Sequence, residues 1–183
     1  FDRRIIVDKP DIDDREEILK VHLDGKTLHK NADLRKIAAR TPGLTGADLE
    51  NILNEAAILA ARNNKKNITM DDLDKSVEQV MLGPERRSRI MSKKQKEKTA
   101  YHELGHAVDG HVLENCDPIH KVSIIPRGRA LGVTQQLPIE DKYTVTKEFA
   151  ENDIAILMGG RVAEELVLNQ RTSGAGNDIE RAT

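Results

Sequence analysis

Apolar residues recur every three or four positions through most of the first half of the chain. This spacing predicts four amphipathic helices, in the stretches DIDDREEILKVHLDG, NADLRKIAARTPG, TGADLENILNEAAILAARNN and TMDDLDKSVEQVMLG. Thr45 and Thr69 stand where N-capping residues belong, and Thr41-Pro42-Gly43 stops the second stretch. This pattern therefore predicts a compact four-helix unit over residues 12–83. The apolar, β-branched run Ile5-Ile6-Val7 before it predicts a short strand.

A change of pattern after Gly83 separates this unit from the rest of the chain. Residues 84–98 are polar and basic, and the acids Glu85 and Glu97 among them favour a solvated linker over a surface for acidic lipid or nucleic acid. From Thr99 onward we expect a second, mostly helical domain. HKVSIIP and ALGVTQQLP predict an antiparallel strand pair in it, and VTKEFAENDIAILMGGRVAEELVL predicts a long helix. The predicted fold class is mainly α with a small β-sheet.

Composition excludes several kinds of protein. Lys and Arg total 29 against 31 Asp and Glu, so the basic excess typical of a nucleic-acid-binding protein is missing. The single cysteine, Cys116, allows neither an internal disulfide nor a cysteine-based zinc site. No apolar run is long enough to span a membrane. Since the chain also starts at Phe1 without a methionine, we expect a soluble fragment of a longer protein.

The stretch TAYHELGHAVDGHV contains the strongest candidate for chemistry. His102 and His106 are four residues apart, so on a helix both lie on one face, one turn apart. Glu103 lies about 100° round the helix, where its carboxylate can reach a water on a metal held by the two imidazoles. His-Glu-x-x-His on a helix is a zinc metalloprotease signature. The alternative is a helix that carries histidines on a wet face by chance.

A third ligand must come from another part of the chain. His111 does not stand at the spacing of the extended zinc-protease motif. Asp109 lies on the right face of the helix, but three ligands along one straight helix would span about 10 Å and could not meet at one ion. Glu164 and Glu165 are candidates for a partner of a metal-bound histidine or for a ligand. Against that, acidic residues are common on a helix of this kind.

Several long segments resemble the FtsH family of membrane-anchored, ATP-dependent AAA+ zinc metalloproteases. In the second half of the chain they are TAYHELGHAV, DPIHKVSIIPRGRALGVTQQLP, ILMGGRVAEEL and TSGAGNDIERAT. In the first half, FDRRIIVDKPDIDDREEILKVH and TPGLTGADLENILNEAAILAAR are similar to the end of that family's AAA+ module and its helical lid. The resemblance implies four parts: the end of the AAA+ core at 1–11, a four-helix lid at 12–83, a linker at 84–98, and a C-terminally truncated zinc-peptidase domain at 99–183.

The same resemblance implies roles for the residues of the second half. His102 and His106 match the family's zinc-binding histidines, Glu103 its catalytic glutamate, and Asp178 in GAGNDIERAT its third zinc ligand. Asp178 follows a glycine-rich loop and opens a new helix, so it is freer to point into a cleft than a glutamate inside a helix. The implied resident cofactor is Zn2+.

Further roles follow by resemblance for other parts of the chain. Gly46 and Ala47 match the lid segment that lies beside bound nucleotide, which implies ATP with Mg2+ in the full-length protein. ALGVTQQLP resembles the edge strand beside the active site, where an extended substrate adds by main-chain pairing. No G-x-x-x-x-G-K-[ST] sequence occurs, so this fragment is not expected to hydrolyse ATP.

The implied function is that of an ATP-dependent zinc endopeptidase which degrades membrane and soluble proteins. Its partners are unfolded or tagged protein substrates and further copies of itself in a homo-hexamer, with no nucleic acid. The full-length protein is expected on the cytoplasmic side of an inner or plasma membrane, anchored by segments absent from this chain.

A non-catalytic alternative keeps zinc as a structural ion in an assembly module. Structural zinc sites are closed by four protein ligands, whereas catalytic sites keep one position open for water. Three candidate ligands with a glutamate beside them favour catalysis.

Overall fold

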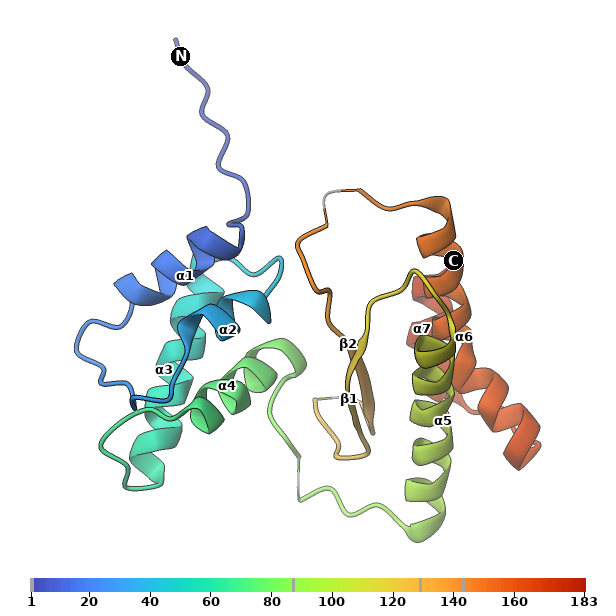
Figure 1. Cartoon of the computed structure of the whole chain (residues 1–183). Coiled ribbons are helices and arrows are strands. Elements are labelled where there is room, and N and C mark those ends of the chain that lie inside the picture. The colour runs from blue at the N-terminus through green and yellow to red at the C-terminus, as the bar shows by residue number, and fades with distance from the viewer. Residues whose placement is uncertain (1, 87, 129, 143) are drawn as a thin grey trace. The chain divides into compact units, whose positions relative to one another are not determined.

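The chain divides into two compact units, residues 1–83 and 84–183. The computed structural model describes residues 2–86, 88–128, 130–142 and 144–183. Phe1 and Arg87, which belong to the segments predicted as 1–11 and 84–98, lie outside the described residues. Helices dominate the described part and one small antiparallel sheet accompanies them (Figure 1), so the predicted mainly α fold class is confirmed.

The N-terminal unit contains the four predicted helices: α1 (Ile12–Val21), α2 (Leu34–Ala39), α3 (Gly46–Arg62) and α4 (Met70–Leu82). Thr45 and Thr69 are N-caps, as predicted, and each forms a reciprocal capping box with the aspartate three residues further on. Asp11 caps α1 in the same way. These boxes satisfy backbone N–H groups that a helix leaves unpaired at its start.

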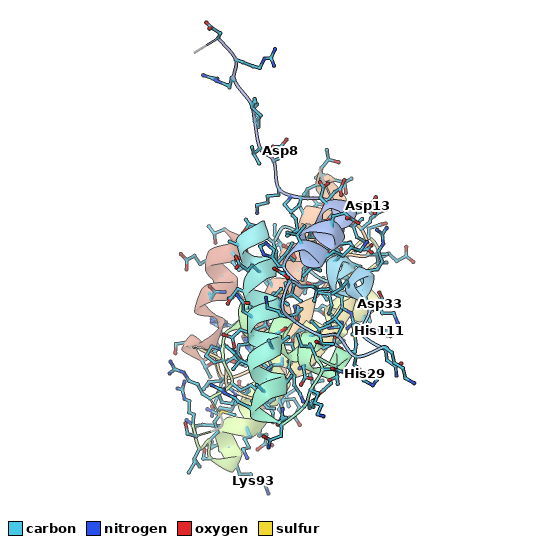
Figure 2. All side chains as sticks on the ribbon, turned by 90° about the vertical axis from the view of Figure 1, so that its left-hand side faces the viewer. Asp8, Asp13, His29, Asp33, Lys93 and His111 are labelled. Carbon is cyan, nitrogen blue, oxygen red and sulfur yellow. The ribbon has the colours of Figure 1, made fainter. Side chains whose placement is uncertain are left out.

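The prediction of a short strand at Ile5-Ile6-Val7 is wrong. Within the part of the chain that the structure describes, residues 2–10 run as extended backbone without strand pairing, and these three side chains are largely exposed. Figure 2 shows Asp8 on this segment, which runs away from the helices of its unit. Apolar β-branched residues favour extended backbone, but a strand forms only where a neighbouring strand takes up its hydrogen bonds.

The core of the N-terminal unit is aliphatic and draws on all four helices. Its central stripe comes from α3, whose apolar residues recur at helical spacing. Arg15 is buried beside this core, where Nε donates to the carbonyl oxygen of Ala38 and Nη1 to that of Pro10, each at 2.9 Å. The first bond ties α1 to the end of α2, and the second ties it to the segment before α1. The buried apolar members are Leu19, Ile37, Ala38, Leu49, Ile52, Leu53, Ala56, Ala60, Ile68, Leu73 and Val77.

Asp72 joins the first turn of α4 to the loop before it. Its carboxylate is fully buried, accepts hydrogen bonds from the N–H and the hydroxyl of Thr69 at 3.0 and 2.6 Å, and lies 2.8 Å from Nζ of Lys65. Burial acts to raise the pKa of Asp72, but the contacts with Lys65 and Thr69 lower it more, so this pKa lies below its ordinary value. The ionised carboxylate therefore stabilises the folded unit.

Replacing Asp72 by alanine is expected to destabilise the N-terminal unit by roughly 1–3 kcal/mol, because a helix cap and a charge-assisted hydrogen bond are lost. A lowered folded-state pKa gives stability that is present above the unfolded value of about 3.9 and is lost as pH falls through the folded value. The difference between wild type and Asp72→Ala should therefore shrink at acidic pH. Amide hydrogen exchange in α3 and α4 measures this difference in stability. Asp71→Ala, which removes an exposed pair with Lys75, is the control, and equal losses in both variants would contradict the assignment.

The C-terminal unit is built on two long helices and a strand hairpin. Its elements are α5 (Lys93–Val112), β1 (Ile119–Ser123), β2 (Val133–Gln136), α6 (Lys147–Leu168), the 3-10 turn η1 (Ser173–Ala175) and α7 (Gly176–Ala182). β1 and β2 are antiparallel, with Val122 opposite Thr134, which confirms the predicted strand pair. The predicted long helix is α6, capped by Thr146.

α5 begins at Lys93, earlier than the start predicted at Thr99. Ser92 and Gln95 form a capping box there, whereas the polar sequence that follows has no apolar stripe to mark a helix. Upstream, Glu85 forms a main-chain bridge with Arg127, and its carboxylate lies 2.7 Å from the buried guanidinium. This part of the predicted linker is therefore bound to the loop between β1 and β2.

α5 and α6 lie side by side (Figure 1) and pack closely at two glycines. A Cβ added at Gly105 would lie 2.3 Å from the carbonyl oxygen of Gly159. One added at Gly159 would lie 2.8 Å from the carbonyl oxygen of Gly105 and 2.2 Å from Oδ2 of Asp109. Because the nearest atoms include helix backbone, they cannot move aside cheaply. The glycine pair therefore sets the separation of the two helices.

Gly105→Ala is expected to destabilise the C-terminal unit, although alanine is the better helix former by about 1 kcal/mol. Overpacking costs typically about 1–3 kcal/mol, and here the added methyl group meets backbone rather than a flexible side chain. Thermal unfolding followed by circular dichroism measures the loss. Gly176→Ala is the matched control, since a Cβ there meets nothing within 4 Å. A variant at Gly105 as stable as the control would disprove the close packing.

Candidate metal centre

Three side chains from two helices meet at one point of the C-terminal unit. His102 and His106 project from α5, and Asp178 projects from the first turn of α7. The two Nε2 atoms are 3.1 Å apart. Oδ2 of Asp178 lies 3.3 Å from Nε2 of His102 and 3.7 Å from Nε2 of His106. All three side chains are largely buried. The structure thus brings together the residues that the sequence suggested as ligands.

These separations fit a single bound zinc ion. Ligand atoms about 2.0–2.2 Å from one tetrahedral zinc lie roughly 3.3–3.5 Å from each other, close to the three separations found here. Two imidazoles and one carboxylate form a donor set that leaves the fourth tetrahedral position for a water or a substrate. Among the described residues this is the one group of histidine, cysteine and acidic side chains placed to hold a metal.

A hydrogen bond on the side of the His106 ring that faces away from Asp178 fixes the tautomer of this histidine. Nδ1 lies 2.7 Å from the carbonyl oxygen of Ile156 on α6, and because a carbonyl can only accept, Nδ1 carries the proton. Nε2 then presents its lone pair to the centre. The N–H of Gly160 lies 3.4 Å from the same Nδ1, a longer contact that this tautomer does not use. The ring is therefore oriented for ligation by the backbone of the neighbouring helix.

Glu164 stands behind the other ring. Its Oε1 lies 3.0 Å from Nδ1 of His102, a close contact whose angle departs from that of a straight hydrogen bond. Glu164 is buried, and Thr172 holds it with an N–H at 2.8 Å and a hydroxyl at 2.9 Å. The carboxylate thus faces the nitrogen of His102 that points away from Asp178. Of the open alternatives, the geometry favours a partner of the histidine over a ligand.

The remaining candidates lie away from the centre. Glu165 is exposed and forms an ion pair with Arg171 at 2.6 Å. His111 is exposed, as expected for a residue outside the site. Asp109 lies against Gly159 at the helix crossing. Burial raises its pKa above the ordinary value, although the charge of His106 acts in the opposite direction.

Glu103 lies beside the two histidines, buried between α5 and β2. The hydroxyl of Thr134 is 2.8 Å from its Oε2. Burial raises the pKa of Glu103, and the hydrogen bond from Thr134 and the charges of the two histidines only partly offset this. A carboxylate with a raised pKa is a stronger proton acceptor than an exposed one.

The candidate ligand side chains shift each other's pKa values. Burial acts to lower the pKa of His102, but the hydrogen bond to Asp178 and the charges of the nearby carboxylates raise it more. Burial acts to raise the pKa of Asp178, yet the same hydrogen bond and the charge of His106 leave it below its ordinary value. Since histidine must be deprotonated to bind zinc, the proton on His102 competes with the metal up to a higher pH than usual.

Three residues of the site were missed in the sequence. Gly160 leaves room for both rings: a Cβ there would lie 2.5 Å from Nε2 of His106 and 2.7 Å from Cε1 of His102. Its signal was the Gly159-Gly160 pair inside an apolar helix, where glycine is costly unless close packing requires it. Thr134 and Thr172 gave no signal, because a lone threonine in a strand or loop has no distinguishing spacing.

Gly46 and Ala47 occupy the first turn of α3, after the N-cap Thr45. Ala47 is exposed and Gly46 is partly so. A free helix N-terminus offers backbone N–H groups to an anion. Their role beside a nucleotide stays a prediction.

Two imidazoles one helical turn apart, an adjacent buried glutamate and a carboxylate from a second helix define the His-Glu-x-x-His class of metallopeptidase sites. Comparison with known families agrees: residues 89–183, just over half of the chain, match the sequence profile of Peptidase family M41, so the chain belongs to this family. Residues 31–75 match the AAA+ lid domain. The resemblance seen in the sequence is thereby confirmed.

Curated relatives are similar to the chain along its whole length. "ATP-dependent zinc metalloprotease FtsH" of Acidobacterium capsulatum is 55% identical over 183 residues, which are all of this chain and 29% of the relative. "ATP-dependent zinc metalloprotease FtsH 3" of Petrotoga mobilis is 53% identical, with 28% of the relative covered, and "ATP-dependent zinc metalloprotease FtsH" of Magnetococcus marinus is 56% identical, with 27% covered. The chain therefore spans less than a third of the length of these relatives.

Asp178→Asn is expected to weaken zinc binding by more than about 100-fold, because changes in groups that only support a ligand already cost about 10–100-fold. Glu164→Gln should fall within that smaller range, and the exposed Glu165→Gln should bind like wild type. Competition with a chelating dye at neutral pH measures all three affinities. Tighter binding by Asp178→Asn than by Glu164→Gln would instead make Glu164 the ligand.

Proposed function

We propose that this chain forms the lid and the zinc-peptidase core of an ATP-dependent zinc endopeptidase that cleaves protein chains. One observation supports the peptidase part above all. Oδ2 of Asp178 and the two Nε2 atoms of His102 and His106 converge, with the buried carboxylate of Glu103 next to them. The names of the relatives, ATP-dependent zinc metalloproteases, agree with this proposal.

In the proposed mechanism each residue has a separate task. His102, His106 and Asp178 would hold Zn2+, which when bound supplies Lewis acidity to a water and to the scissile carbonyl. Glu103 takes the proton of the attacking water on a carboxylate oxygen and returns it to the leaving amine. Its raised pKa makes it a better acceptor in the first step. His106 donates its Nδ1 proton to the carbonyl of Ile156, which leaves Nε2 for the metal.

The structural-zinc alternative fits these contacts less well. A closed site needs a fourth protein ligand. Among the described residues, the other buried carboxylates nearby are engaged elsewhere: Glu164 with Thr172 and His102, and Glu103 with Thr134. A buried glutamate beside an open position is the arrangement that hydrolysis requires.

The nucleotide part of the proposal concerns the N-terminal unit. We place Gly46 and Ala47 beside ATP and Mg2+ in the complete protein, because they belong to the matched AAA+ lid segment and lie in the first turn of α3. Unfolded or tagged protein substrates, a homo-hexameric ring and anchoring on the cytoplasmic side of a membrane belong to the same proposal for the complete protein. No helix among the described residues has the length and apolar character needed to cross a membrane.

Glu103→Gln in the complete protein is expected to keep stoichiometric zinc and to lower the rate of peptide cleavage by roughly 10²–10⁴-fold, because glutamine is nearly isosteric but cannot accept the proton. Metal analysis and cleavage of an unfolded protein such as casein measure the two properties on one preparation. Glu165→Gln, on the exposed face of α6, is the control and should cleave like wild type. Near-normal cleavage by Glu103→Gln would remove Glu103 as the base.

A further inference from the structure

The side chain of Glu103 is held by strand β2 and by the glycine just before it. The hydroxyl of Thr134 lies 2.8 Å from Oε2 of Glu103 and also 2.8 Å from its main-chain oxygen. A hydroxyl has one proton to donate, and both acceptors in reach belong to the same residue. Thr134 therefore fixes the carboxylate relative to the backbone of its own helix.

Gly132 packs against the side chain of Glu103, and its missing side chain leaves room for that glutamate. A Cβ at this position would lie 2.6 Å from Oε1 of Glu103, 2.8 Å from its Cγ and 2.7 Å from Cγ2 of Thr99. The backbone of Gly132 is buried and its φ is not in the left-handed region, so no turn requires a glycine there. What requires it is the closeness of the Glu103 side chain.

From these two contacts we infer that Thr134 is a positioning residue for the general base, and that Gly132 provides the space in which the base is held. The inference rests on the proposed role of Glu103. A glutamate has three side-chain torsions, and an unrestrained carboxylate would sample several positions around the metal centre. The hydroxyl of Thr134 selects one of them, and Gly132 keeps that position unfilled.

The arrangement also connects the base to the strand pair. Thr134 is opposite Val122 in the β1–β2 register, so its main chain is fixed by the ladder while its side chain reaches α5. A shift of β2 would therefore move the hydrogen-bond donor of Glu103 while leaving the zinc ligands, which lie on α5 and α7, in place. Positioning of the base and binding of the metal are thus separable.

Thr134→Val and Thr134→Ser in the complete protein test the inference. Valine keeps the shape and loses the hydroxyl, whereas serine keeps the hydroxyl. A short fluorogenic peptide serves as substrate, so that cleavage rather than unfolding is measured, and kcat and KM are determined separately. We expect Thr134→Val to lower kcat by roughly 10–100-fold, the effect of losing one hydrogen bond to a charged group, with KM and zinc content unchanged. Thr134→Ser should restore most of kcat.

Two further measurements keep the test decisive. Thr144→Val makes the same chemical change at an exposed threonine and should leave kcat at the wild-type value. In crystal structures, the Glu103 carboxylate should remain beside Gly132 in wild type and Thr134→Ser and adopt another rotamer in Thr134→Val. This structural readout does not depend on activity.

Each other outcome overturns the inference. Wild-type kcat in Thr134→Val would show that the hydroxyl is not needed. Equal impairment of the valine and serine variants, or loss of zinc or of folding in Thr134→Val, would assign Thr134 to packing. These results differ from those that would contradict the proposed function itself. In that case wild type would cleave the peptide without zinc, or Glu103→Gln would cleave it as fast as wild type.

Discussion

The metal centre depends on the closeness of α5 and α6 at Gly105 and Gly159. With ordinary side chains at these positions the two helices would stand further apart. The carbonyl of Ile156 would then no longer reach Nδ1 of His106. Glu164, two turns further along α6, would lose its contact with the other ring. Two glycines that carry no chemistry therefore bring one helix within hydrogen-bonding distance of the histidines on the other.

Burial of so many ionisable groups in one place is costly unless a cation compensates them. Glu103, Glu164, Asp178 and the two histidines are all mostly withdrawn from water. Burial raises the pKa of Glu103, and the neighbouring carboxylates raise the pKa of His102 against the effect of its own burial. A divalent ion between the ligands would offset the negative charge of the carboxylates. The electrostatics of the site thus agree with its geometry in favouring an occupied centre.

The sequence predicted those parts of this structure that have a short-range signature. The four N-terminal helices have apolar residues at helical spacing and threonine caps, and the histidine pair has a fixed spacing on one helix. Asp178 was favoured by family resemblance and by its place at the start of a helix after a glycine-rich loop, whereas periodicity gave no sign of it, because contacts across many residues leave no local pattern. The start of α5 was misplaced since its first turns are polar on every side. The strand at Ile5-Ile6-Val7 was wrong because local propensity contains no information about a partner. Thr134 and Thr172 act only through tertiary contacts, which periodicity does not reveal.

The pairing of Glu85 with Arg127 determines where the C-terminal unit can be separated from the rest of the chain. A boundary drawn at Thr99, where the recognisable motif starts, would remove the part of α5 from Lys93 to Lys98 together with the cap at Ser92. A boundary at Ser92 would preserve the helix but delete Glu85, whose carboxylate contacts the buried guanidinium of Arg127. The main-chain bridge between Glu85 and Arg127 and the hydrogen bond from Arg86 N to Pro126 O would be lost as well. Removing a carboxylate that contacts a buried guanidinium is destabilising, because it takes away part of the compensation for the buried charge. A domain exchange between relatives would therefore have to transfer everything from Pro84 onward.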